Sequence, residues 1–172
     1  MPGIHTIVID TVTFLLDMYE SQYIVGSTNG MVAWGNFNQF FKTLMQDKVA
    51  RSRCNVVMLA HTLETYNEQS LSYETKVPVK GSLKNQGIEA YFSCVVSTKR
   101  LQLTKLESYA NTLLDITDED QLLGYKHVFQ TRPTKETTGE RIRSPIRLFS
   151  TPETFMDNSV QKLLDRLHSY YK

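Results

Sequence analysis

The chain has 172 residues, of which 41% are hydrophobic and 22% are charged. These values are typical of an ordinary globular protein, and they exclude collagen, coiled-coil and low-complexity proteins. There are 19 Lys and Arg residues against 18 Asp and Glu residues, so the formal net charge is only +1. No overall basic field therefore exists to attract nucleic acid or an anionic membrane, and any nucleic-acid contact must be local.

The cysteine pattern and the lengths of the apolar runs indicate in which cellular compartment the protein is expected. Cys54 and Cys94 lie in apolar runs without CxxC spacing, which argues against a disulfide framework or a zinc cluster and favours a reducing cytoplasm. No apolar run approaches the roughly 20 residues that span a bilayer. Residues 1–5 lack the pattern of a signal peptide. We therefore expect a cytoplasmic protein without membrane contact.

Two apolar runs in the first half predict an α/β fold. Residues 4–10 are rich in β-branched side chains and end in Asp10, a pattern typical of a buried parallel strand. Residues 54–60 form a second such run, which ends next to His61. The segment between the two runs contains helical periodicity, so we expect a parallel crossover.

The remaining elements follow from periodicity and from capping residues. Asn36 can cap a helix whose apolar face runs from Phe37 to Met45, and Asp157 can cap an amphipathic helix at the carboxyl end. The other expected elements are a short helix over 11–19 with Phe14, Leu15 and Met18 on one face, a loop over 63–79, a short helix over 81–90, a third strand over 91–98, a helical insertion over 101–122, and late strands over 124–130 and 142–149. Without repeats or Pro/Gly-rich linkers, we expect residues 1–172 to form a single domain.

Asp10 and His61 are the main candidates for catalytic residues. An apolar strand that ends in aspartate is the Walker B arrangement, in which the acid holds a Mg²⁺-bound water beside nucleotide phosphates. The neighbouring strand of such sheets presents a polar residue that senses the γ-phosphate, and His61 has this position. The alternatives are an acid that caps the next helix and a structural histidine.

Several motifs occur in an order that resembles phage-encoded RecA-like proteins, an AAA-type ATPase group linked to single-strand annealing and recombination. They are Ile7–Thr11, Val56–Thr62, the polar loop, Pro78–Ser82, Cys94–Ser97, Gln130–Lys135 and the Tyr-rich final helix. The likeness covers the carboxyl-terminal two-thirds of that fold. It implies a RecA-like P-loop NTPase core with a mostly parallel sheet, late antiparallel strands and a C-terminal helix. It also implies the cytoplasm of an infected bacterial host, if the chain is phage-encoded.

The resemblance also implies roles for individual residues. Asp10, with Thr11, would bind Mg²⁺ and ATP, and His61 would be the sensor. Residues 63–79 match a loop that faces DNA in relatives, where Lys76, Lys80 and Lys84 would contact phosphates of single-stranded DNA and Tyr66 or Tyr73 would stack on bases. Arg143 matches a cation that reaches the nucleotide of a neighbouring subunit in ring-forming relatives. Ordinary solvated side chains are the alternative for these positions.

A P-loop, GxxxxGK[ST], is absent from the chain, and neither Gly26–Gly30 nor Lys80–Ser82 replaces it. In RecA-like sheets the P-loop strand lies between the two strands predicted over 54–60 and 91–98, so its absence leaves a gap. A separate chain or segment, direct pairing of the flanking strands, or a homo-oligomer would fill it. We expect part of a recombination ATPase that is inactive as this chain alone. The alternative is a degenerate, non-hydrolysing remnant that acts as a protein-interaction or regulatory module.

Overall fold

The computed structural model describes residues 3–69 and 71–172. Met1 and Pro2, which belong to the expectation about a signal peptide, lie outside the described residues, as does Ser70 of the expected loop. The fold is mixed α/β, with 40% helix and 21% strand. The chain divides into two compact units, residues 1–91 and 92–172. The two units are described separately below.

The first unit contains the predicted parallel strand pair. Strand β1 (Thr6–Ile9) pairs with β2 (Asn55–Met58), in a register that places Ile9 beside Met58. These two strands pair only with each other in the described part of the chain. The expected burial is wrong, because Ile7 and Val8, which point to opposite faces, are both exposed. A two-stranded sheet has too few neighbouring elements here to cover both faces.

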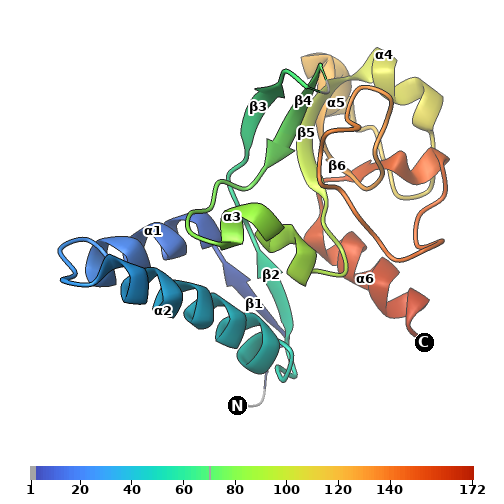
Figure 1. The fold of residues 1–172 in the computed structure, drawn as a ribbon. Coiled ribbons are helices and arrows are strands. Elements are labelled where there is room, and N and C mark those ends of the chain that lie inside the picture. Colours follow the sequence, from blue (N-terminus) through green and yellow to red (C-terminus); the bar gives the residue numbers. More distant parts are fainter. Residues whose placement is uncertain (1–2, 70) are drawn as a thin grey trace. The chain divides into compact units, whose positions relative to one another are not determined.

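Two helices lie between these strands in the sequence (Figure 1). Helix α1 (Val12–Tyr23) is capped by Thr11, and α2 (Gly30–Thr43) is capped by Asn29. The Asn29 side chain accepts a hydrogen bond from the backbone N–H of Val32. Asn36 is therefore inside α2 and is not its cap. A π-helical stretch, η1 (Leu44–Val49), continues α2. The buried side chains of α2 and η1 include Phe37, Phe41 and Met45, as the periodicity predicts.

The segment expected to be a loop is a β-hairpin. Strands β3 (Leu63–Asn67) and β4 (Ser72–Lys76) pair in antiparallel register, with Tyr66 opposite Tyr73. The predicted short helix over 81–90 is present as α3 (Leu83–Gln86) followed by a 3₁₀ turn, η2 (Ile88–Tyr91).

The second unit is built on an antiparallel sheet in the order β5-β6-β7. Its strands are β5 (Ser97–Gln102), β6 (Tyr125–Gln130) and β7 (Phe155–Asp157). The mostly parallel sheet of a RecA-like core is thus not confirmed, since the parallel sheet has only two strands. The strand predicted over 142–149 is wrong, because only Arg143 forms an isolated bridge there, with Val95. The strand predicted over 91–98 is mostly wrong, because only its last two residues belong to a strand, β5.

Helices and two apolar clusters complete this unit. Residues 101–122 contain the end of β5, then α4 (Leu103–Leu106), η3 (Glu107–Tyr109) and, after an irregular stretch, most of α5 (Asp118–Leu123). A 3₁₀ turn, η4 (Pro152–Thr154), precedes β7. The predicted final helix is α6 (Val160–Tyr170), capped by Ser159 instead of Asp157. The buried side chains at the centre of the two clusters are Leu106, Leu114, Val128, Phe155, Phe129, Leu148, Phe149 and Met156.

Candidate functional site

The carboxyl ends of β1 and β2 lie side by side and bring three of the predicted residues into one region. The backbone N–H of Leu59 donates to the carbonyl oxygen of Ile9 at 2.9 Å, which extends the strand pairing beyond β2. Asp10 and Thr11 follow β1 directly, and His61 comes three residues after β2. This end of the sheet is where open α/β proteins hold their ligands.

His61 is held against the first turns of α1. Its backbone N–H donates to Thr13 Oγ1 at 3.1 Å, and its ring meets the Phe14 ring edge-on, with centroids 5.3 Å apart. The side chains of Asp10 and His61 are both exposed. Thr11 is engaged as the helix cap, because its hydroxyl accepts the Phe14 N–H at 3.3 Å. Asp10 and His61 are therefore accessible to a ligand, whereas Thr11 already has a structural role.

The donor set at this edge suits a magnesium ion only in part. A single exposed carboxylate such as Asp10 is the kind of group that holds Mg²⁺ through its water shell. No group of three or more His, Cys, Asp or Glu side chains able to hold a metal occurs within residues 3–69 and 71–172. The backbone amides and lysine of a P-loop are also missing from the sequence. Asp10 is therefore one carboxylate that could hold Mg²⁺ through water, and the residues present do not form a phosphate cradle.

Apolar side chains are exposed near these groups. On β1, Val8 is 56% exposed, and on α1, Phe14 is 57% and Met18 is 68% exposed. The face of α1 expected to pack inward thus carries two exposed residues, while Val12 and Leu16 are the buried ones. Another molecule that bound to β1 and α1 could cover these side chains.

The β3–β4 hairpin brings Tyr66 and Tyr73 together. Their ring centroids are 5.2 Å apart, and both side chains are more than half exposed. Residues 63–76 carry three glutamates and only one lysine, Lys76. The hairpin can therefore offer aromatic faces to a ligand, but its charge repels phosphate groups.

The lysines expected to contact DNA have different surroundings. Lys76 is half-buried at the end of β4, and Lys84 is exposed on α3. Lys80 Nζ lies 2.6 Å from a carboxylate oxygen of Glu20, and this hydrogen bond raises the pKa of Lys80. Lys80 is thus a partly compensated charge, and of these three lysines only Lys84 is an exposed cation without a described partner.

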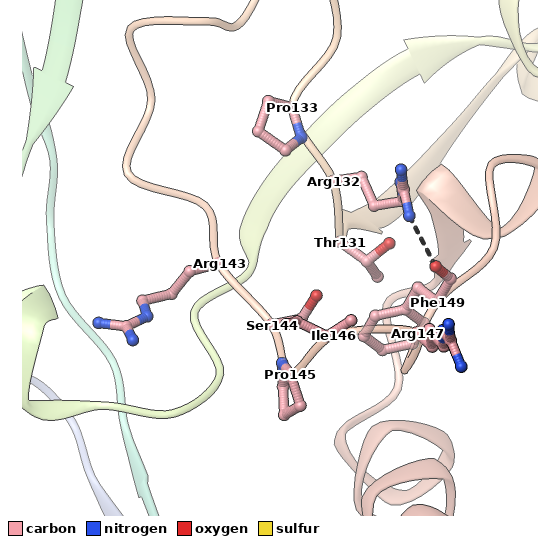
Figure 2. Close-up of a pocket in the computed structure, with 9 residues that line it drawn as sticks. All are labelled: Thr131, Arg132, Pro133, Arg143, Ser144, Pro145, Ile146, Arg147 and Phe149. Atoms are coloured by element: carbon pink, nitrogen blue, oxygen red, sulfur yellow. Dashed lines mark hydrogen bonds between the residues drawn. The ribbon is translucent and has the colours of Figure 1, made fainter.

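Arg143 belongs to the second unit, where it borders a pocket of about 380 Å³. Figure 2 shows Arg132 and Arg147 at the same pocket, with the Arg143 side chain extending away from them. The Arg143 backbone exchanges two hydrogen bonds with Val95, of 2.8 and 3.1 Å. Arg132 and Arg147 were not among the predicted site residues, although the excess of cations over acids between residues 132 and 147 is visible in the sequence.

Cys94 is the cysteine of the second unit, and it is not a reactive centre. Burial raises the pKa of the Cys94 thiol to about 11, so it stays protonated at neutral pH and is a poor nucleophile.

Comparison of the chain with protein-family models, curated proteins and solved structures finds no match. Among the residues described, no helix has the length and apolar character required to cross a membrane. The geometry described above is therefore the basis for a functional proposal.

Proposed function

We propose that the chain is part of a RecA-like ATPase of the recombination type and supplies the Walker B acid and the sensor to a nucleotide site. The supporting observation is the position of Asp10 and His61 after adjacent parallel strands, at the same edge of one sheet. Mg²⁺-ATP bound there would bring the phosphoryl group that is hydrolysed. In this proposal Asp10 would hold Mg²⁺ through its water shell, and His61 would contact the terminal phosphate.

The proposal requires a P-loop from another segment or chain. Support comes from the two-stranded sheet with Ile7 and Val8 exposed, since parallel strands are normally buried on both faces within larger sheets. The carrier of the P-loop would add its strand beside β2, and its other elements would cover Val8. It would also supply the amides and the lysine that bind the phosphates.

The test is ATP hydrolysis by the tagged chain after native purification from the cells that encode it. We expect a complex that contains a P-loop protein and hydrolyses ATP at about 1 s⁻¹ or faster. Asp10→Asn should lower this rate at least 100-fold without releasing the partner, because the amide removes the charge facing Mg²⁺. The matched control is Asp17→Asn, which removes an exposed carboxylate from α1.

Two results would contradict the proposal. One is hydrolysis at a normal rate by the isolated chain, which has no P-loop. The other is an Asp10→Asn complex that hydrolyses ATP like the unaltered one.

A non-hydrolysing interaction module is the second candidate. The exposure of Val8, Phe14 and Met18 favours it as much as it favours an incomplete ATPase, because both need a partner that covers these side chains. A stable complex without ATPase activity, equally stable with Asp10→Asn, would support this candidate over the first.

A further inference from the structure

The loop between β6 and η4 concentrates positive charge. We call residues 131–147 the arginine loop. It holds five cations and two acids, within a chain whose formal net charge is only +1. The cations are Arg132, Lys135, Arg141, Arg143 and Arg147, and the acids are Glu136 and Glu140.

Both acids of the arginine loop are neutralised by lysines from outside it. Glu140 lies 2.5 Å from Lys99 Nζ on β5, and it also accepts a hydrogen bond from Ser97 Oγ at 2.8 Å. Glu136 pairs with Lys105 on α4. The carboxylates therefore contribute little to balance the arginines of their own loop.

Three arginines at the pocket keep their charge uncompensated. No carboxylate in the described part of the chain pairs with Arg132, Arg143 or Arg147. Arg132 uses one N–H to donate to the Phe149 carbonyl oxygen at 2.8 Å, which leaves its other donors for a ligand. Glu153, which follows the loop, is already paired with Arg166 at 3.1 Å. Three arginines are thus among the residues that line the pocket, and no Asp or Glu is among the described residues that line it.

The directions of the side chains indicate the shape of the ligand. In Figure 2 the Arg143 side chain extends to one side of the pocket, and those of Arg132 and Arg147 lie on the other. Guanidinium groups that spread apart cannot close on one small anion, but they can meet successive phosphates of a chain. The aromatic ring at the pocket, Phe149, is only 2% exposed and offers no face for base stacking.

We propose that the arginine loop binds the phosphodiester backbone of a nucleic acid without reading its sequence. Three separated cations would contact consecutive phosphates and release the counterions around them, so binding weakens steeply with salt. This inference does not depend on the proposed nucleotide site, because it concerns other residues and needs no ATP.

The experiment measures binding of fluorescently labelled oligothymidine to the full chain by anisotropy at increasing KCl concentration. Arg143→Gln and Arg147→Asn should each weaken binding several-fold and reduce the slope of log affinity against log salt by about 1. Asparagine suits position 147 because the backbone there has φ of +65°, in the left-handed region that asparagine tolerates. The control is Arg53→Gln, an exposed arginine in the first unit.

Oligoadenine of the same length should bind with the same affinity as oligothymidine, because the bases are not read. The thermal unfolding midpoints of all variants should match that of the unaltered chain, which shows that the variants fold. The inference is wrong if the unaltered chain does not bind oligonucleotide at low salt. It is also wrong if the loop variants bind like the unaltered chain, or if Arg53→Gln weakens binding as much as they do. A last control adds inorganic phosphate or ATP as a competitor, at the same concentration of phosphate groups as an unlabelled oligonucleotide. If these small anions compete as strongly as the oligonucleotide does, the site binds a single small anion, and the inference is wrong.

Discussion

At the scale of single residues, Gly81 shows how a position that looks like a phosphate motif serves the fold. It lies in Lys80–Ser82, and its φ is +64°, a conformation that glycine adopts without strain. A Cβ added to Gly81 would lie 3.0 Å from Cε3 of Trp34 on α2. Glycine is thus required here both by the backbone conformation and by the indole ring beside it.

Gly81→Ala should therefore lower the free energy of unfolding by about 2–3 kcal/mol, from left-handed backbone strain and from overpacking against Trp34. The matched control is Gly26→Ala, because Gly26 also has a positive φ, +80°, but open space around it. Its cost should be about 1 kcal/mol, from backbone strain alone. Urea unfolding of both variants measures the difference, and equal losses would show that Trp34 moves aside freely.

At the scale of elements, a chain of ion pairs ties α5 and α6 to the strands of the second unit. Lys126 on β6 lies 2.8 Å from Asp120 and 3.5 Å from Asp157, while Lys162 on α6 lies 2.6 Å from Asp157. Asp120 also accepts a hydrogen bond from the Thr117 N–H at 2.9 Å, which completes the capping box of α5. The Asp157 side chain thus bonds to Lys162, whereas capping of α6 falls to Ser159.

The pH dependence of stability should report this arrangement. The hydrogen bond from Lys126, together with those from Thr117, lowers the pKa of Asp120 from 3.8 to about 2. A carboxyl group with a lowered pKa stabilises the fold above its unfolded pKa, and this contribution is lost as the pH falls from about 4 to about 2. Asp120→Asn should lower the free energy of unfolding by about 2 kcal/mol at pH 7 and by almost nothing at pH 2.

Urea unfolding at several pH values measures that difference for Asp120→Asn. The control is Asp118→Asn, which removes an exposed carboxylate from the first turn of α5 and should change stability by less than about 0.5 kcal/mol. A cost of Asp120→Asn that stayed constant down to pH 2 would show that the ion pair with Lys126 does not lower the pKa.

At the scale of the whole molecule, the sequence predicts elements with strong periodicity and misses those whose signal depends on their neighbours. β1, β2 and α6 are found where their patterns predict them, and Asp10 and His61 do come to one sheet edge. The hairpin of residues 63–76 was missed because its strands carry mostly polar side chains and bury no continuous apolar face. The spread of the arginines depends on the irregular backbone of the loop, which no periodicity encodes.

The burial of β1 was predicted wrongly for a physical reason. An apolar run indicates that a strand can be buried, but burial also requires elements that cover both faces. In the first unit, β1 has one neighbouring strand, and Ile7 and Val8 remain exposed. In the function proposed above, the P-loop partner would supply the missing cover.

This uncovered surface gives the last prediction. Substituting exposed apolar residues by Val8→Thr together with Met18→Gln should change the free energy of unfolding by less than about 0.5 kcal/mol, because these side chains lose little apolar contact. Leu16→Ala, at a position on α1 that is only 4% exposed, should cost about 2–5 kcal/mol. Thermal and urea unfolding of the isolated chain distinguish the two cases.

The double variant should also bind less of a hydrophobic fluorescent dye and associate less at high concentration. If it instead loses more than about 1 kcal/mol, Val8 and Met18 are buried in solution, and they are not free for a P-loop partner to cover.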